Sequence, residues 1–316
     1  MTNRLKRIDT RNMPRDQWLQ IRRKTIGGSD AAGIVGLSSY ATPYTVWANK
    51  TGRLPDSEDN EAMRQGRDLE EYVAKRWMEA TGKTVRRCNA ILYNSLYPFA
   101  HADIDRSVIG ENAGLECKTT STLNIRQFHG VDFPEKYYVQ CVHYMAVTGA
   151  DQWYLAVLVL GKGFYTFVLE RNQEEIDALM AAERDFWELV KKDTPPDLDG
   201  LEATGAALQA IYPASSGSSI QLYGRESMLN EYFSLRSEAQ TLEERMEQIV
   251  NTIKQDMQES ERGNCGGFSV LWKTQARRQF QPKEFEKAHP EIDLRPYYKQ
   301  TTSRPFKITQ TLKDAV

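Results

Sequence analysis

The sequence predicts an α+β protein in which a mixed β-sheet is flanked by helices. Three stretches carry the strand part of this prediction: the segment 102–120 shows two short strand patterns joined by a turn, and the runs 152–160 and 163–170 are dense in aliphatic and aromatic residues. Apolar residues recur at helical spacing at 60–81, and a capping residue followed by acidic residues opens a further helix at 172–192. Strands and helices are therefore interleaved along the chain, as expected for a sheet covered by helices.

The elements can be justified in chain order. Pro14 suits the first turn of a short amphipathic helix, Thr51 and Gly52 stop the next one, and Asn172 caps a later one. Gly161 and Gly163 turn the chain between the two apolar strands, which we expect to form a buried hairpin at the heart of the sheet. The remaining expected elements are helices at 14–23, 43–50, 60–81 and 134–147 and strands at 88–93 and 97–104.

The chain after residue 198 reads as an appendage. Prolines end a first domain at 1–198, and 199–222 is expected to be a linker of low structure. A region 223–316 follows, in which a long helix at 223–262 carries apolar residues in alternating steps of three and four, a heptad stripe. The tail returns to a β pattern around a short helix at 282–288. Two interpretations of the helix stay open, an arm that packs in its own chain and a coiled coil with another protomer.

Composition excludes several classes of protein. The chain has 316 residues, 27% of them charged, and a net charge of −2, so it is neither disordered nor strongly basic. It has no apolar run long enough to span a bilayer, and no signal-peptide pattern opens it. The four cysteines are too scattered for a zinc or iron–sulfur site. We expect a cytoplasmic protein with no membrane association, whose contacts with nucleic acid would be local basic clusters.

The segment 102–120 also holds the first candidate site. Glu116 and Lys118 are two residues apart on a strand and share one face, while Cys117 points to the other. A hairpin would bring Asp103 beside Glu116, so that two carboxylates and a lysine meet on one surface. That combination suits a hard divalent cation and a group that holds water. Taken alone, the same residues also fit an ordinary solvated hairpin.

Other candidate residues lie on helices. The loop TIGGSD ends at Ser29 and Asp30 just before a helix, where a side chain caps the helix and free amides could hold a phosphate. Glu70 borders the apolar stripe of the helix at 60–81 and could point into a site. Gln140 and Tyr144 are four residues apart and stack along one helix. Plain capping is the alternative for Ser29 and Asp30, and simple surface exposure is the alternative for Glu70.

The order of these features resembles the YqaJ-type viral recombinases, the phage lambda exonuclease family within the PD-(D/E)XK nucleases. The resemblance covers about 22–187 and is carried by five motifs in the family's order: IRRKTIGGSDAAGIVG, GRDLEE, AHADID, LECKT and QCVHYMAVTG. It implies a restriction-endonuclease-like core. Two departures stand out, because His101-Ala102 replaces the family's Ser-Pro and Ile104 replaces its Gly. Asp105 shares a face with Asp103, so it remains open as an alternative ligand.

The resemblance implies roles for single residues. Asp103 and Glu116 would ligate Mg²⁺ or Mn²⁺, with the Cys117 carbonyl as a further ligand. Lys118 would position the attacking water, and Glu70 would hold a second metal or its water. In the same way, the family pattern assigns Gln140 to orienting the lysine or the scissile phosphate, and Arg22 and Ser29 to contacting a terminal 5′-phosphate. Tyr144, one turn from Gln140, is a further candidate for substrate binding.

The leading hypothesis is a Mg²⁺-dependent 5′→3′ exonuclease of double-stranded DNA in phage-type recombination, encoded by a phage or prophage and active in the bacterial cytoplasm. The family resemblance implies a single-strand annealing recombinase as partner and a homo-oligomeric ring, often a trimer. Two alternatives stay open: an endonuclease or structure-specific nuclease on the same core, and a catalytically silent DNA-binding module.

Overall fold

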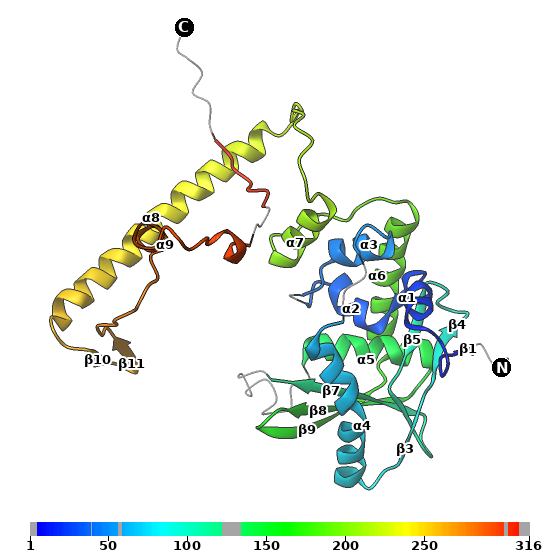
Figure 1. Ribbon diagram of the computed structural model, residues 1–316. Coiled ribbons are helices and arrows are strands. Elements are labelled where there is room, and N and C mark those ends of the chain that lie inside the picture. Colours follow the sequence, from blue (N-terminus) through cyan, green and yellow to red (C-terminus); the bar gives the residue numbers. More distant parts are fainter. Residues whose placement is uncertain (1–4, 39, 56–58, 122–133, 300–302, 310–316) are drawn as a thin grey trace. The chain divides into compact units, whose positions relative to one another are not determined.

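The computed structural model describes residues 5–38, 40–55, 59–121, 134–299 and 303–309 (Figure 1). The chain forms two compact units, residues 1–213 and 214–316, and each is described by itself. The first unit contains every residue that the sequence assigned to a site. Among the described residues, no helix combines the length and apolar character needed to cross a bilayer.

The first unit is built on two sheets. The larger is mixed, with strand order β3-β6-β7-β8-β9, and its only parallel pair among the described strands is β7 with β8. The smaller has the order β1-β4-β5-β2, with β2 and β5 parallel. Their bounds are β1 Leu5–Asp9, β2 Ile26–Gly27, β3 Val85–Arg87, β4 Ala90–Asn94, β5 Ala100–Asp103, β6 Arg106–Val108, β7 Ala113–Thr120, β8 Gln152–Val159 and β9 Gly163–Glu170.

Helices cover both faces of the larger sheet (Figure 1). On one face Trp77 of α4 packs in a core cluster with Leu115 of β7, and on the other α5 packs with Trp153 of β8. Because side chains alternate along a strand, Leu115 faces α4 and its neighbour Glu116 faces α5. The helices of this unit are α1 Arg15–Arg23, α2 Gly28–Ile34, α3 Pro43–Lys50, α4 Glu61–Thr81, α5 Glu135–Thr148, α6 Gln173–Lys191 and α7 Glu202–Ile211.

The predicted hairpin at 102–120 is wrong, because its first strand does not pair with its second. Asp103 does end a strand, but that strand, β5, pairs with β4 of the smaller sheet through Ile91. The antiparallel partner of β7 is instead β6, in which Arg106 lies opposite Leu115. The chain crosses from one sheet to the other at Ile104 and Asp105, so the acidic segment lies at a junction between sheets. The run 163–170 also differs, because β9 is an edge strand and not the heart of the sheet.

The expected linker at 199–222 contains a helix, so its predicted low structure is wrong at α7. Ala207 of α7 is buried in a cluster with Trp47 of α3, and the hydroxyls of Thr204 and Thr42 are 2.7 Å apart. This packing extends the first unit to Pro213, beyond the predicted boundary at 198. A ten-residue helix is marginal in isolation and depends on such tertiary contacts.

The second unit contains a long helix and a small hairpin. α8 spans Glu226–Met257 within the predicted 223–262, and β10 (Arg262–Cys265) pairs with β11 (Phe268–Leu271). α9 (Pro282–Ala288) lies where the short helix was expected, and a 3₁₀ turn follows at Arg295–Tyr297. The heptad stripe of α8 is exposed along the chain at Leu235, Leu242, Met246, Ile249 and Ile253.

Candidate active site

Glu116 is a buried carboxylate at the centre of the candidate site. Only 3% of its side chain is exposed, and its Oε1 lies 2.5 Å from Lys118 Nζ and accepts a hydrogen bond of 2.8 Å from Gln140 Nε2. Its Oε2 has no hydrogen-bond partner in the part of the chain that the structure describes. Because a buried carboxylate oxygen without a partner is costly, the position favours an added ligand.

Lys118 lies on the same face of β7 as Glu116, as the strand alternation predicted. Its ammonium group also lies 5.5 Å from the centre of the Tyr137 ring. Burial alone lowers the pKa of Lys118, but the nearby charges of Glu116 and Asp105 raise it above its ordinary value. Lys118 is therefore a protonated hydrogen-bond donor at neutral pH, suited to holding a water or an anionic oxygen.

Asp103 and Asp105 occupy different positions at the sheet junction. Asp105 Oδ2 accepts a hydrogen bond of 2.8 Å from the backbone amide of Cys117, which places it beside Glu116. Asp103 Oδ2 instead accepts a hydrogen bond of 2.9 Å from the indole of Trp18 on α1. The sequence left Asp105 open as an alternative ligand to Asp103. In the structure, Asp105 is the one of the two that accepts a hydrogen bond from the strand of Glu116.

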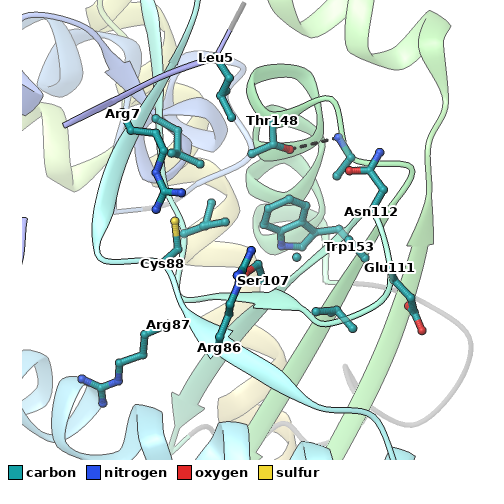
Figure 2. Close-up of a pocket in the computed structure, with 16 residues that line it drawn as sticks. Leu5, Arg7, Arg86, Arg87, Cys88, Ser107, Glu111, Asn112, Thr148 and Trp153 are labelled. Carbon is teal, nitrogen blue, oxygen red and sulfur yellow. Dashed lines mark hydrogen bonds between the residues drawn. The ribbon is translucent and has the colours of Figure 1, made fainter. Parts of the chain in front are cut away.

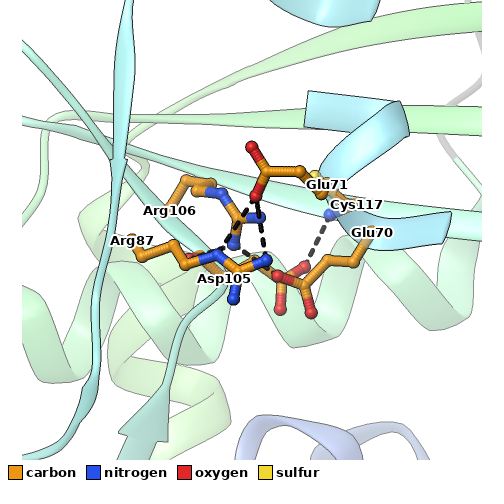
Figure 3. Close-up of polar contacts among 6 residues, drawn as sticks. All are labelled: Glu70, Glu71, Arg87, Asp105, Arg106 and Cys117. Carbon is orange, nitrogen blue, oxygen red and sulfur yellow. Dashed lines mark hydrogen bonds and ion pairs between the residues drawn. The ribbon is translucent and has the colours of Figure 1, made fainter. Parts of the chain in front are cut away.

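Glu70 reaches the same cluster from α4 but is paired with a cation (Figure 3). Its carboxylate contacts the Arg106 guanidinium, whose side chain is only 3% exposed. Arg106 also donates to the Asp105 carbonyl at 2.9 Å and to Glu71 Oε2 at 3.0 Å, and Arg87 binds the same Glu71 oxygen at 2.9 Å. The network holds Glu70 at the edge of the site.

Burial and mutual repulsion make the acidic cluster hold protons tightly. Burial is the main cause that raises the pKa of Asp105 well above its ordinary value, and the charges of Glu116 and Glu70 add to the rise. Burial also raises the pKa of Asp103, against the opposing effects of Arg22 and Trp18. A cation entering such a cluster would replace protons and relieve the repulsion, so the electrostatics favour metal uptake.

The donor chemistry fits a hard divalent cation. The cluster offers carboxylate oxygens from three elements, the kind of ligand that Mg²⁺ and Mn²⁺ prefer, and Glu116 Oε2 is an unpartnered member of it. Within the described ranges, however, no three Asp, Glu, His or Cys side chains already form a ligand set. Glu70 and Glu116 are instead paired with Arg106 and Lys118. The roles of Asp103, Glu116, Glu70 and the Cys117 carbonyl as ligands remain predictions.

A second group of polar side chains lies at the start of α2. Arg22 Nη2 donates to Ser29 Oγ at 2.6 Å, and the Arg22 guanidinium stacks 4.3 Å from the centre of the Trp18 ring. Asp30, not Ser29, caps the helix by accepting a hydrogen bond from the Gly27 amide, and it pairs with Lys50. The structure therefore brings Arg22 and Ser29 together, and Trp18 connects them to Asp103.

Gln140 and Tyr144 hold the cluster together from α5. Gln140 Nε2 bridges Glu116 and the Tyr144 hydroxyl, and that hydroxyl donates to the Asp103 carbonyl at 3.0 Å. Tyr144 is buried, and a Cβ added at Gly28 would lie 2.6 Å from its ring. These contacts place Tyr144 against the start of α2, which carries Ser29, and there Tyr144 supports the site. Its contact with substrate stays a prediction.

Sequence reasoning missed two residues of the site. Trp18 lies four positions before Arg22, so helical spacing could have placed its ring beside the guanidinium. Arg106 directly follows Asp105, but nothing local shows that its side chain is buried between two glutamates of α4. Only the packing of α4 against the larger sheet reveals that contact.

Residues 17–151 match the YqaJ-like viral recombinase domain family. The chain is 36% identical over 318 residues to an uncharacterised protein, YqaJ, of Bacillus subtilis (strain 168), and the match covers 98% of this chain and 99% of that one. Among solved structures it is similar to LHK-Exo, an alkaline exonuclease from Laribacter hongkongensis (TM-score 0.48, 19% identity, 56% of this chain and 93% of that chain). It is also similar to a phage-related exonuclease from Haemophilus somnus 129PT (TM-score 0.41, 14% identity, 56% and 99%).

The fold is the α+β class that the sequence predicts, with mixed sheets flanked by helices and an acidic cluster beside a lysine. The similarity to the Bacillus subtilis protein extends over nearly the whole length of both chains, and this decides the family. The chain belongs to the YqaJ-like viral recombinase family, which confirms the resemblance inferred from its five motifs.

Proposed function

We propose that this protein is a metal-dependent exonuclease that shortens double-stranded DNA in the 5′→3′ direction during phage-type recombination. The observation that carries the proposal is Glu116, a buried carboxylate with one unpartnered oxygen and with Lys118 bound to the other. Asp105 and Glu70 surround it with further acidic oxygens. Membership of the viral recombinase family supports DNA as the substrate.

Hydrolysis of a phosphodiester requires a water to attack phosphorus while negative charge grows on the phosphate oxygens. A divalent cation such as Mg²⁺ or Mn²⁺, held by Glu116, by Asp105 or Asp103 and by Glu70, would lower the pKa of that water and offset the charge. Lys118, which is protonated, would donate a hydrogen bond to the attacking water or a phosphate oxygen. Gln140 would keep the Glu116 carboxylate in one orientation through its bond to Oε1.

The direction of digestion would come from the second group of residues. Arg22 Nη2 lies 2.6 Å from Ser29 Oγ. A guanidinium beside a hydroxyl is well suited to binding a terminal phosphate, which carries two charges. Trp18 stacks on Arg22 and donates to Asp103, so it couples this pocket to the acidic cluster. A 5′-phosphate bound there would place the first phosphodiester of the strand near the cluster.

The proposed assembly follows the family resemblance. A homo-oligomeric ring, such as a trimer, would enclose the duplex, and a single-strand annealing recombinase would bind the strand that is left. The exposed heptad stripe of α8 supports self-association, since a helix with one apolar stripe needs a partner to cover it. We also propose that the protein works in the cytoplasm of a bacterial host and is encoded by a phage or prophage.

The experiment that tests the proposal compares linear and closed circular duplex DNA, each with Mg²⁺ and with EDTA, by release of acid-soluble nucleotides. Loss of linear DNA alone, and only with metal, is expected. Cutting of the circle would favour an endonuclease, and no loss of either would favour a silent binding module.

Two matched variants locate the activity. Lys118→Ala should abolish cleavage and leave DNA binding largely intact, whereas Lys75→Ala, which removes an exposed lysine from α4, should change neither. Normal cleavage by Lys118→Ala would refute the proposed site. Arg22→Ala should slow digestion of 5′-phosphorylated ends more than that of 5′-hydroxyl ends, and equal loss on both would count against the phosphate pocket.

A further inference from the structure

A cavity of about 400 Å³ lies between the two sheets of the first unit (Figure 2). β1 and β4 of the smaller sheet supply Leu5, Arg7 and Leu92, and the larger sheet supplies residues of β3, β6, β7 and β8. The volume falls within the range of about 300–1,000 Å³ typical of small-molecule sites. A duplex is far too wide to enter it.

The cavity is separate from the acidic cluster although the same chain segment borders both. Ile104 lines the cavity, whereas Asp103 and Asp105 on either side of it belong to the cluster. On β7 the lining residue is Gly114, two residues before Glu116. A ligand in the cavity would therefore not occupy the proposed metal site.

Two guanidinium groups at this cavity form no ion pair with a carboxylate among the described residues. The Arg7 side chain makes no hydrogen bond or ion pair within the described residues. Arg86 Nε donates to the Ser107 hydroxyl at 3.2 Å, which leaves the Nη groups of Arg86 available. Both act on the Cys88 thiol between them: burial raises the pKa of Cys88, and the charges of Arg7 and Arg86 oppose the rise. Figure 2 shows the three side chains on one side of the cavity.

The other charged residues of the lining are already neutralised. Arg87 is bound to Glu71, and the Glu111 carboxylate is paired with Lys83 and accepts a hydrogen bond from the Tyr154 hydroxyl at 2.8 Å. The net charge available to a ligand is therefore positive. This selects an anion and not a cation.

Trp153 adds a buried donor. The residue is fully buried and lines the cavity, and its indole N–H has no hydrogen-bond partner within the described part of the chain. A buried donor without an acceptor is unfavourable, so a ligand acceptor that reaches this N–H would be favoured. Leu5, Leu92, Ile104 and Val108 complete an apolar wall.

We propose that this cavity binds a phosphate ester of nucleotide size, with its phosphate between Arg7 and Arg86 and its less polar body toward Trp153. Inorganic phosphate alone would leave most of the volume and the apolar wall unused. The proposal rests on the cavity itself and does not depend on exonuclease activity.

Calorimetry in EDTA with thymidine 5′-monophosphate tests the site. The full-length protein would carry Arg22→Ala, so that the 5′-phosphate pocket proposed above does not contribute. We expect saturable binding, at least tenfold weaker binding of thymidine and of inorganic phosphate, and at least a tenfold loss on adding Arg7→Ala and Arg86→Ala. The control pair Lys6→Ala and Arg11→Ala removes the same charge from β1 and the turn after it but from outside the lining, and should bind normally.

A second readout reports on the buried donor. The ¹⁵N-indole signal of Trp153, assigned with Trp153→Phe, should shift as the nucleotide binds. No binding, an unmoved indole signal, or an equal loss in the control pair would each overturn the proposal. If the Arg7 and Arg86 substitutions instead weaken binding of a 5′-hydroxyl duplex and leave nucleotide binding unchanged, the two arginines contact the DNA backbone and the small-molecule site is refuted.

Discussion

Replacing Arg106 by methionine should destabilise the first unit markedly. Met keeps much of the side-chain length and apolar contact but removes the guanidinium, which is 3% exposed and donates to Glu70, to Glu71 and to the Asp105 carbonyl. The change leaves Glu70 next to the other acids of the site without its cation (Figure 3). Repulsion within the cluster would then rise.

The magnitude follows from the exposure of each partner. Removing one member of a buried ion pair costs about 3–5 kcal/mol when the remaining charge cannot be hydrated. Glu70 is 27% exposed and Glu71 is 63% exposed, so water compensates part of the loss. We therefore expect a loss of about 2–3 kcal/mol in the free energy of unfolding, below the cost of fully buried pairs. For a unit of this size, each kcal/mol lowers Tm by about 2–4 °C.

Urea denaturation followed by far-UV circular dichroism measures this loss. Arg87→Met is the matched control, because Arg87 binds the same Glu71 oxygen but both members of that pair are exposed. Exposed pairs contribute about 0–1 kcal/mol, so the control should stay near wild type. If Arg106→Met unfolds at the same urea concentration as Arg87→Met, the buried network does not stabilise the fold and the reasoning is wrong.

Three further results are expected. Burial raises the pKa of Asp30, but Lys50 and Arg22 lower this pKa more, to below its ordinary 3.8. The ionised Asp30 therefore contributes its full stabilisation above about pH 4, and this stabilisation is lost as pH falls through the folded-state pKa. Asp30→Asn should remove this acid dependence and cost about 3 kcal/mol at pH 7 by leaving Lys50 buried and unpaired, as urea curves at several pH values would show. Asp105→Asn should abolish cleavage, whereas Asp103→Asn should cost about 10–100-fold in single-turnover assays, the effect of an outer-shell partner; the reverse order would make Asp103 the ligand. Truncation after Pro213 should lower the number of protomers per particle, measured by light scattering, and an unchanged number of protomers would refute self-association through α8.

Local patterns were sufficient to predict much of the site. Strand alternation placed Glu116 and Lys118 on one face, and helical spacing put Gln140 one turn from Tyr144; both contacts are present. The fold class and most helix positions follow from apolar periodicity for the same reason, because each is decided within a few residues of sequence.

What the sequence could not show depends on pairing between distant segments. Asp103 and Asp105 are equivalent by strand alternation, and only the crossing between two sheets gives one of them the Cys117 amide and the other the Trp18 indole. α7 was missed because its stability comes from α3, about 160 residues earlier, through Thr42 and Thr204. Arg106 likewise reads as a surface residue until α4 covers it.

The acidic cluster lowers the stability of the metal-free fold. This gives a test of metal binding that needs no DNA. Glu116 has an unpartnered buried oxygen, and burial raises the pKa of Asp103, Asp105 and Glu116 together. A ligand that binds only the folded state stabilises it by about 2.7 kcal/mol at one hundred times its Kd. Mg²⁺ or Ca²⁺ should therefore raise Tm in a saturable way, which differential scanning calorimetry would follow.

The matched substitution for this test is Glu116→Gln. This substitution keeps the shape of the side chain and one oxygen acceptor. It removes the negative charge that a cation needs, and it also removes the free-energy cost of burying that charge. The variant should be at least as stable as wild type without metal and should gain much less from Mg²⁺. An equal rise in Tm for both proteins would place the cation elsewhere in the molecule. A less stable metal-free variant would mean that the Lys118 pair outweighs the burial cost, so that Glu116 has a structural role.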